Sequence, residues 1–97
     1  MRSLEDVLTV IASMREDLAR RGVRRIGVFG SVARGTQRPD SDVDVLVDLE
    51  PGSSLLDLVA IRRMLSEALG CPVDVASRRG LRPEIEQSVL EDVHDAA

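Results

Sequence analysis

The segment from Val28 to Leu49 constrains this chain most, because two short apolar runs there enclose a polar loop that carries Gly and Arg. The first run ends at Gly30 and Ser31, and the second carries Asp42 and Asp44 among valines. Successive side chains of an extended strand point to opposite faces. Asp42 and Asp44 therefore share one face of a strand, and the intervening valines share the other.

Two carboxylates held one strand period apart repel each other, and the segment has no Lys or His that could neutralise them. A divalent cation between the carboxylates would offset the repulsion, and hard oxygen ligands suit Mg2+. Mg2+ usually keeps waters and takes substrate phosphates as further ligands. The acidic pair therefore predicts a magnesium site that handles a nucleotide.

Gly30 and Ser31 are suited to binding the phosphates of that nucleotide. A glycine at a strand end lets a phosphate approach the backbone, and a hydroxyl residue that opens a helical turn offers N–H and O–H donors. The alternative is an ordinary strand-to-helix turn. Arg34 would hold phosphate oxygens or the departing pyrophosphate, or else is an exposed arginine at a helix end. Gly35 is expected to give the loop either flexibility or a positive φ angle.

The string GSVARGTQRPDSDVDVLVD, in which GS is followed by ten residues and then DxD, resembles the signature of the DNA polymerase beta-like nucleotidyltransferase superfamily. It is most similar to the small MNT branch, whose members are often paired with HEPN-domain proteins. The resemblance implies ATP as substrate and two Mg2+ ions bridged by Asp42 and Asp44. It also implies a third acid that completes the metal site and accepts the proton of the nucleophile, and Asp74 matches that acid.

Asp74 stands alone between Val73 and Val75, and a covered aspartate at such a position needs a metal or a hydroxyl as partner. The alternative is an edge-strand aspartate that faces water or Arg78. Asp48 falls on the same alternating face as Asp44 but about 13 Å further along the strand, too far to share an ion. It is expected to be a surface acid.

The helical and extended patterns predict an α/β (α+β) fold with a mixed sheet of three or more strands. Because Gly30 leaves its strand where Asp42 enters the next, these two strands should be antiparallel. Asp42 and Asp74 both lie near strand entrances, so their strands should be parallel and joined by a crossover helix. The predicted helices cover 3–22, 54–69 and a segment that starts at Pro83, and the predicted strands cover 25–29, 42–49 and 71–76.

Composition narrows the function further. The 97 residues are expected to form one domain, 1–97, and the aromatic share of 1% leaves almost nothing on which a base could stack. A net charge of −4 argues against binding to DNA or to a membrane surface. One cysteine and the lack of a membrane-length apolar run suggest a cytoplasmic protein.

The MNT resemblance implies an antitoxin that transfers AMP to a hydroxyl of a HEPN-domain ribonuclease toxin. Two alternatives remain open: an antitoxin that neutralises the toxin by binding alone, and a nucleotidyltransferase of a small acceptor such as an aminoglycoside. A homo-oligomer and a hetero-oligomer with the toxin are both compatible with the sequence.

Overall fold

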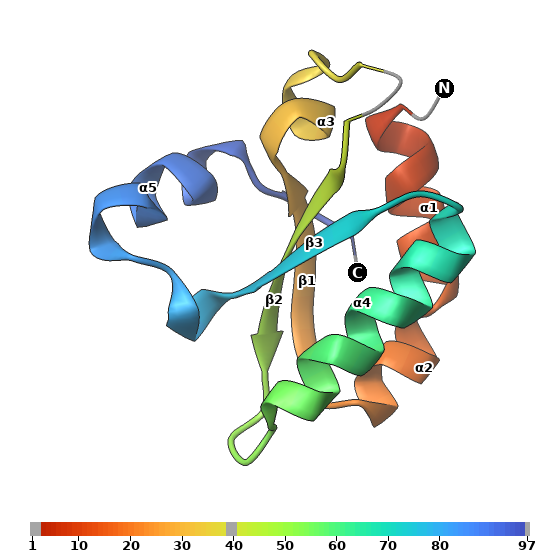
Figure 1. Cartoon of the computed structure of the whole chain (residues 1–97), viewed down its shortest axis with the longest axis vertical. Coiled ribbons are helices and arrows are strands. Elements are labelled where there is room, and N and C mark those ends of the chain that lie inside the picture. The colour runs from red at the N-terminus through yellow and green to blue at the C-terminus, as the bar shows by residue number, and fades with distance from the viewer. Residues whose placement is uncertain (1–2, 39–40, 97) are drawn as a thin grey trace.

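The computed structural model describes residues 3–38 and 41–96, and it folds these segments into a mixed sheet with helices on both faces (Figure 1). The strands are β1 (Val23–Phe29), β2 (Val43–Leu49), β3 (Val73–Ser77) and β4 (His94–Asp95), in the spatial order β3-β2-β1-β4. Strand β2 runs antiparallel to β1 and parallel to β3. The fold class and the relative directions of the predicted strands are confirmed.

Three helices cover one face of the sheet: α1 (Leu4–Ser13), α2 (Arg15–Arg20) and α4 (Leu55–Leu69). Helix α4 is the crossover between the parallel strands β2 and β3, as predicted. Its first turn is closed by Asp57, whose carboxylate accepts from the Ser54 amide at 2.9 Å. It ends at Gly70, which has a φ of 68°.

The first predicted helix, 3–22, is interrupted. Ser3 followed by Asp6 is the sequence pattern of a capping box, and the structure forms it. Helix α1 begins at Leu4 after the N-cap Ser3, whose hydroxyl accepts from the Asp6 amide at 3.1 Å. Met14 then leaves helical geometry, with ψ near 8°, and separates α1 from α2. Helical periodicity continues across a single irregular residue, so apolar spacing alone gave no sign of the break.

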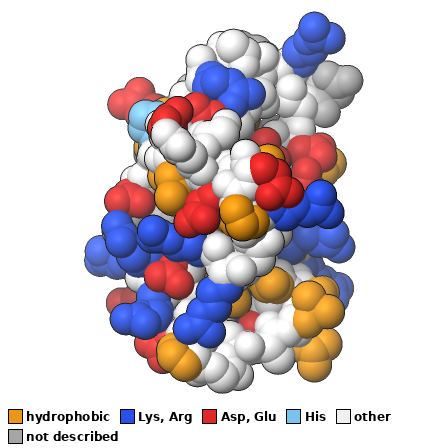
Figure 2. Space-filling model, turned by 90° about the vertical axis from the view of Figure 1, so that its left-hand side faces the viewer, with side chains coloured by type: hydrophobic (Ala, Val, Ile, Leu, Met, Phe, Trp, Pro, Cys, Tyr) orange, Lys and Arg blue, Asp and Glu red, His pale blue; other side chains and the backbone are white. Residues whose placement is uncertain are grey.

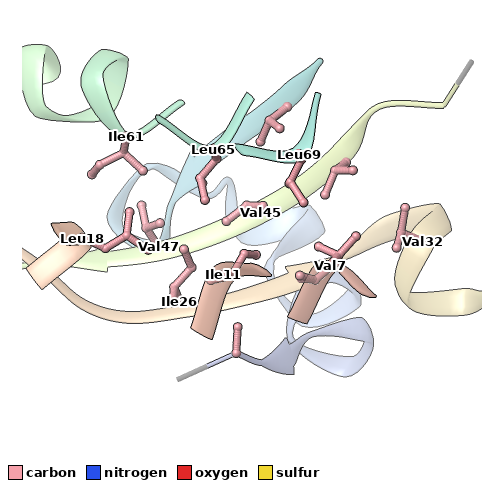
Figure 3. Packing of buried hydrophobic residues seen from close by; sticks show 14 residues of the cluster. Val7, Ile11, Leu18, Ile26, Val32, Val45, Val47, Ile61, Leu65 and Leu69 are labelled. Carbon is pink, nitrogen blue, oxygen red and sulfur yellow. The ribbon is translucent and has the colours of Figure 1, made fainter. Parts of the chain in front are cut away.

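The core lies between these helices and the sheet (Figure 3). Fully buried aliphatic side chains come from both layers, including Ile11, Ile61 and Leu65 from the helices and Val45 and Val47 from β2. Among residues 3–38 and 41–96 no polar or charged residue is buried. The core is therefore a dry aliphatic cluster that fixes the sheet against the helices.

Helix α5 (Pro83–Asp92) lies against the opposite face of the sheet, preceded by a 3-10 turn, η1 (Arg78–Gly80). The predicted start at Pro83 is confirmed. Helical spacing predicts an apolar stripe of Ile85, Val89, Leu90 and Val93, but Ile85 is 46% exposed. The stripe is shorter because Val89 is the buried residue of this helix.

The end of a chain is commonly expected to fray, and for residues 94–96 this expectation is wrong. His94 and Asp95 form β4 and pair with Val28 and Gly27 of β1. Gly27 makes this approach possible, since a Cβ there would lie 2.6 Å from Val93 Cγ2 and 2.9 Å from the His94 carbonyl oxygen.

Other element ends shift by one or two residues, as boundaries commonly do. The predicted strand 42–49 begins at Val43, and the predicted strand 71–76 covers 73–77. The predicted loop over 35–41 includes residues 39 and 40, which lie outside the described residues. No helix within the described segments is long and apolar enough to cross a membrane.

Candidate active site

The sheet topology brings the predicted site residues to one end of three adjacent strands. Phe29, the last residue of β1, pairs with Asp44 of β2, and Asp44 pairs with Asp74 of β3. Neighbouring residues in register on paired strands point to the same face. Asp44 and Asp74 are thus side by side. On the other side of Asp44 lies Phe29, and Gly30 is the next residue of the chain.

Asp42 differs slightly from its predicted position. It precedes β2 instead of opening it, since the strand begins at Val43, whose amide donates to the Pro72 carbonyl oxygen at 3.2 Å. Asp42 is exposed, Asp44 is partly buried and Asp74 is exposed. The charge of Asp42 nevertheless acts on Asp44, which places the two carboxylates in one electrostatic environment.

Gly30 is fitted against the Asp44 carboxylate. Its φ of 76° lies in the left-handed region, and a Cβ built on it would lie only 2.2 Å from Asp44 Oδ2. Any side chain at position 30 would therefore displace the carboxylate. The absence of a side chain creates the close approach between the first turn of α3 (Gly30–Arg34) and the acidic pair.

The α3 turn is itself well defined. Ser31 is partly buried, and its carbonyl oxygen accepts from the Thr36 amide at 2.9 Å. Gly35 ends the helix in the left-handed region, with φ of 73°, as predicted. Ser31 follows Gly30, the residue that lies against Asp44.

Negative charge accumulates at Asp44. The pKa of its carboxyl is raised above the ordinary value of 3.8, first by burial and then by the negative charges of Asp74 and Asp42. The Arg34 guanidinium opposes this effect and lowers the same pKa. Three carboxylates and one arginine therefore share one field, which is the electrostatic arrangement that a bound cation would relieve.

Arg34 has a partner that the sequence pattern does not indicate. Its guanidinium donates to the Asp92 carboxylate at the end of α5, 58 residues away along the chain. No local pattern could have indicated the pair, since it depends on how α5 packs beside α3. Arg34 is half exposed and remains close enough to Asp44 to affect its charge.

The sequence alternatively predicts that Asp74 faces water or Arg78, and it predicts that Asp48 is a surface acid. No ion pair joins Asp74 to Arg78 in the segments 3–38 and 41–96. Asp48 lines a separate pocket of about 160 Å³ together with Arg25 and Arg78. Charges of both signs are interspersed over this α5 side of the molecule (Figure 2).

The donor set fits Mg2+ in its chemistry and its charge, with hard carboxylate oxygens around a site of accumulated negative charge. The described residues contain no group of three His, Cys, Asp or Glu side chains already arranged as a metal cage. Mg2+ is usually held by one or two carboxylates together with waters and substrate phosphates.

A mixed sheet with paired acids facing a glycine-serine turn defines a class of phosphate-handling transferases. The family model described as "Nucleotidyltransferase domain" matches residues 11–96. The chain therefore belongs to the nucleotidyltransferase domain family, and its resemblance to minimal nucleotidyltransferases is confirmed.

Similar proteins cover nearly the whole chain. The protein adenylyltransferase MntA of Thermococcus cleftensis is 40% identical over 94 residues, which span 96% of this chain and 95% of that protein. A solved structure provisionally assigned as a minimal nucleotidyltransferase is 41% identical, with a TM-score of 0.84, and the match covers 96% of this chain and 95% of that one.

A more distant structure shares the fold. The crystal structure of a toxin-antitoxin with AMP-PNP superposes with a TM-score of 0.72 at 24% identity, covering 89% of this chain and 72% of that one. At this identity the match establishes the common fold of the two chains.

Proposed function

We propose that this protein transfers AMP from ATP to a hydroxyl of a partner protein, a HEPN-domain ribonuclease toxin, and so acts as its antitoxin. The observation that carries the proposal is the in-register pair Asp44 and Asp74, with Asp42 nearby and Gly30 directly against Asp44. A protein acceptor is supported by the name of the relative from Thermococcus cleftensis. ATP is supported by the AMP-PNP in the distant toxin-antitoxin structure.

Asp42 and Asp44 would hold Mg2+, and Asp74 would complete the site of a second ion on the nucleophile side. When bound, the ions supply positive charge that stabilises both the attacking and the leaving oxygen of the displacement. The pKa of Asp44 is raised first by burial and then by the charges of Asp74 and Asp42, and a cation at this site would compensate that second effect.

Side chains and backbone groups of this protein bind the triphosphate and accept the proton. The Ser31 hydroxyl, the amides beside Gly30 and the Arg34 guanidinium bind the triphosphate and orient its α-phosphorus toward the acceptor. The acceptor hydroxyl oxygen forms a bond to that phosphorus while the bond to the β-phosphate oxygen breaks. Pyrophosphate leaves, and Asp74 accepts the hydroxyl proton.

The proposal is tested by incubating the protein with ATP radiolabelled at the α-phosphate, Mg2+ and the purified protein encoded by the adjacent gene. Label should pass to that protein, and EDTA or the variant D42A/D44A should abolish the transfer. Ribonuclease activity of the adjacent protein should fall in step with labelling. Neutralisation of the ribonuclease by D42A/D44A as effective as that by wild type would overturn the catalytic proposal in favour of binding alone.

A further inference from the structure

A groove of about 700 Å³ runs between helix α4 and the outer side of strand β3. Its lining starts at Val59, passes Arg62 and Arg63, and ends at Asp74. The groove therefore reaches Asp74, the residue assigned above to the acceptor side of the reaction. We call it the acceptor groove.

The helical wall of the acceptor groove belongs to the exposed face of α4, which continues from Val59 beyond the groove to Leu55. Residues 55, 59, 62 and 66 recur at helical spacing and share this face, whereas Ile61, Leu65 and Leu69 are buried on the other. At 1.5 Å per residue, the face from Leu55 to the end of α4 is about 21 Å long. This length suits a segment of a macromolecule better than a small molecule.

The far end of this face is apolar and open to solvent. Leu55 is 75% exposed, Leu56 is 78% exposed and Val59 is 51% exposed. Single exposed apolar residues are common on protein surfaces, whereas a cluster of them is typical of a protein-binding patch. The adjacent leucines Leu55 and Leu56 form such a cluster with Val59. The patch lies on a rigid element, because the helix is capped at Asp57 and closed at Gly70.

The middle of the groove is basic, although the chain as a whole has a net charge of −4. Arg63 makes an exposed ion pair with Glu67 at 3.4 Å. Within the described segments no carboxylate lies within ion-pair distance of Arg62. Such arginines favour an acidic partner, while the acids Glu67 and Asp74 in the same groove disfavour the continuous phosphates of a nucleic acid.

The β3 wall of the acceptor groove is an open sheet edge. In the order β3-β2-β1-β4, strand β3 is bonded to β2 on one side only. The turn that joins α4 to β3 is fixed, since the Ser66 hydroxyl donates to the Cys71 carbonyl oxygen at 2.8 Å. An incoming polypeptide therefore meets a rigid wall that can offer main-chain hydrogen bonds.

We propose that the acceptor groove binds the protein acceptor itself. Apolar side chains of the acceptor pack on Leu55, Leu56 and Val59, acidic side chains pair with Arg62 and Arg63, and the acceptor hydroxyl is thereby delivered to Asp74. This inference rests on the proposed function, because it names the surface that presents the substrate protein to the same site.

The test uses the full chain and the purified protein encoded by the adjacent gene. The variant R62A/R63A should weaken the complex, measured by calorimetry without ATP, by at least about tenfold and should raise KM for the protein acceptor similarly. Its affinity for MgATP should stay within about twofold of wild type. R20A/R21A is the matched control, because Arg20 is also exposed and pairs with an acid on its own helix.

A second variant examines the apolar end. L56D should weaken the complex at least as much as R62A/R63A, whereas I85D, which changes an exposed apolar residue on α5, should leave it unchanged. Both positions are solvent-exposed, so neither change disturbs the core.

The outcomes separate the two proposals. Wild-type transfer with unchanged binding and KM in R62A/R63A and L56D would overturn the docking proposal and leave the function intact. A complex that these variants weaken, without AMP transfer by wild type, would support the groove and overturn the catalytic function. Absence of both complex and transfer would overturn both.

Discussion

The two faces of strand β2 show how one short element combines a scaffold with a charged site. Val43, Val45 and Val47 point into the core and are at most 2% exposed, whereas Asp44 and Asp48 point to the opposite face and are partly exposed. Burial of the valines stabilises the fold, while the clustered carboxylates around Asp44 oppose it. Mutation of the valines should therefore lower stability and leave activity nearly unchanged. Mutation of Asp44 should lower activity and, in the absence of metal, raise stability.

The largest effect on activity is expected for D44N. A metal ion held by Asp44 would stabilise charge on the reacting oxygens by several kcal/mol, so loss of this ligand should lower kcat for AMP transfer about 1,000-fold. At neutral pH the metal-free variant should be more stable than wild type, because a repelled carboxylate has become neutral. Urea denaturation in EDTA and the transfer assay measure the two effects.

The matched control is D48N, which changes an acid on the same face of β2 but outside the carboxylate cluster. It should retain wild-type transfer. Loss of transfer in D48N, or full transfer in D44N, would contradict the assignment of the site.

G30A should affect the acidic face next most strongly. The added methyl would meet Asp44 Oδ2 at 2.2 Å in a backbone conformation that favours glycine. A displacement of a reacting group by about 1 Å lowers turnover roughly 100-fold. G35A is the control, because Gly35 has a similar φ of 73° but nothing within 4 Å of its added Cβ. Equal losses of transfer in both variants would attribute the effect to backbone strain alone.

V45A examines the apolar face of the same strand. Removing two buried methyl groups from a fully buried side chain should lower the free energy of unfolding by about 2 to 3 kcal/mol. The kcat per folded molecule should stay close to that of wild type, since the acidic face is unchanged. Chemical denaturation measures the free energy of unfolding, and the transfer assay measures kcat. A large fall in kcat would show that the two faces are coupled.

A smaller effect is expected for D92N. The Asp92 carboxylate holds Arg34 and adds negative charge near the site proposed for the triphosphate. Because exposed pairs contribute about 0.2 to 1 kcal/mol, its removal should lower KM for ATP by up to about fivefold. A higher KM would instead mean that Asp92 positions Arg34 for phosphate binding. Steady-state kinetics at varied ATP concentration distinguish these results.

The pH dependence of stability should be the most modest effect. The folded protein binds the Asp44 proton more tightly than the unfolded chain, whose pKa is near 3.8. The Asp44 contribution to stability therefore falls as the pH rises from about 3.8 through the raised pKa of the folded state. The stability difference between D44N and wild type, measured in EDTA at several pH values, should grow over this window. A constant difference would contradict the raised pKa.

Much of this arrangement could be predicted from local patterns. The valine-aspartate alternation gave the two faces of β2, and the order of Gly30, Asp42 and Asp74 along the chain gave the directions of β1, β2 and β3. The capping residues Ser3 and Pro83 gave helix starts. These features depend on backbone periodicity and on hydrogen bonds between near neighbours, which a sequence displays directly.

The sequence by itself thus determined the main strands, the crossover helix and the chemical character of the site. Only the tertiary structure decided the pairing of β4 with β1, the contact of Arg34 with Asp92, and the exposure of Leu55 and Leu56 on α4. Each of these depends on contacts between segments distant in the chain, whose strength comes from packing and desolvation. Such contacts produce no short-range periodic pattern in the sequence, so the sequence does not predict them.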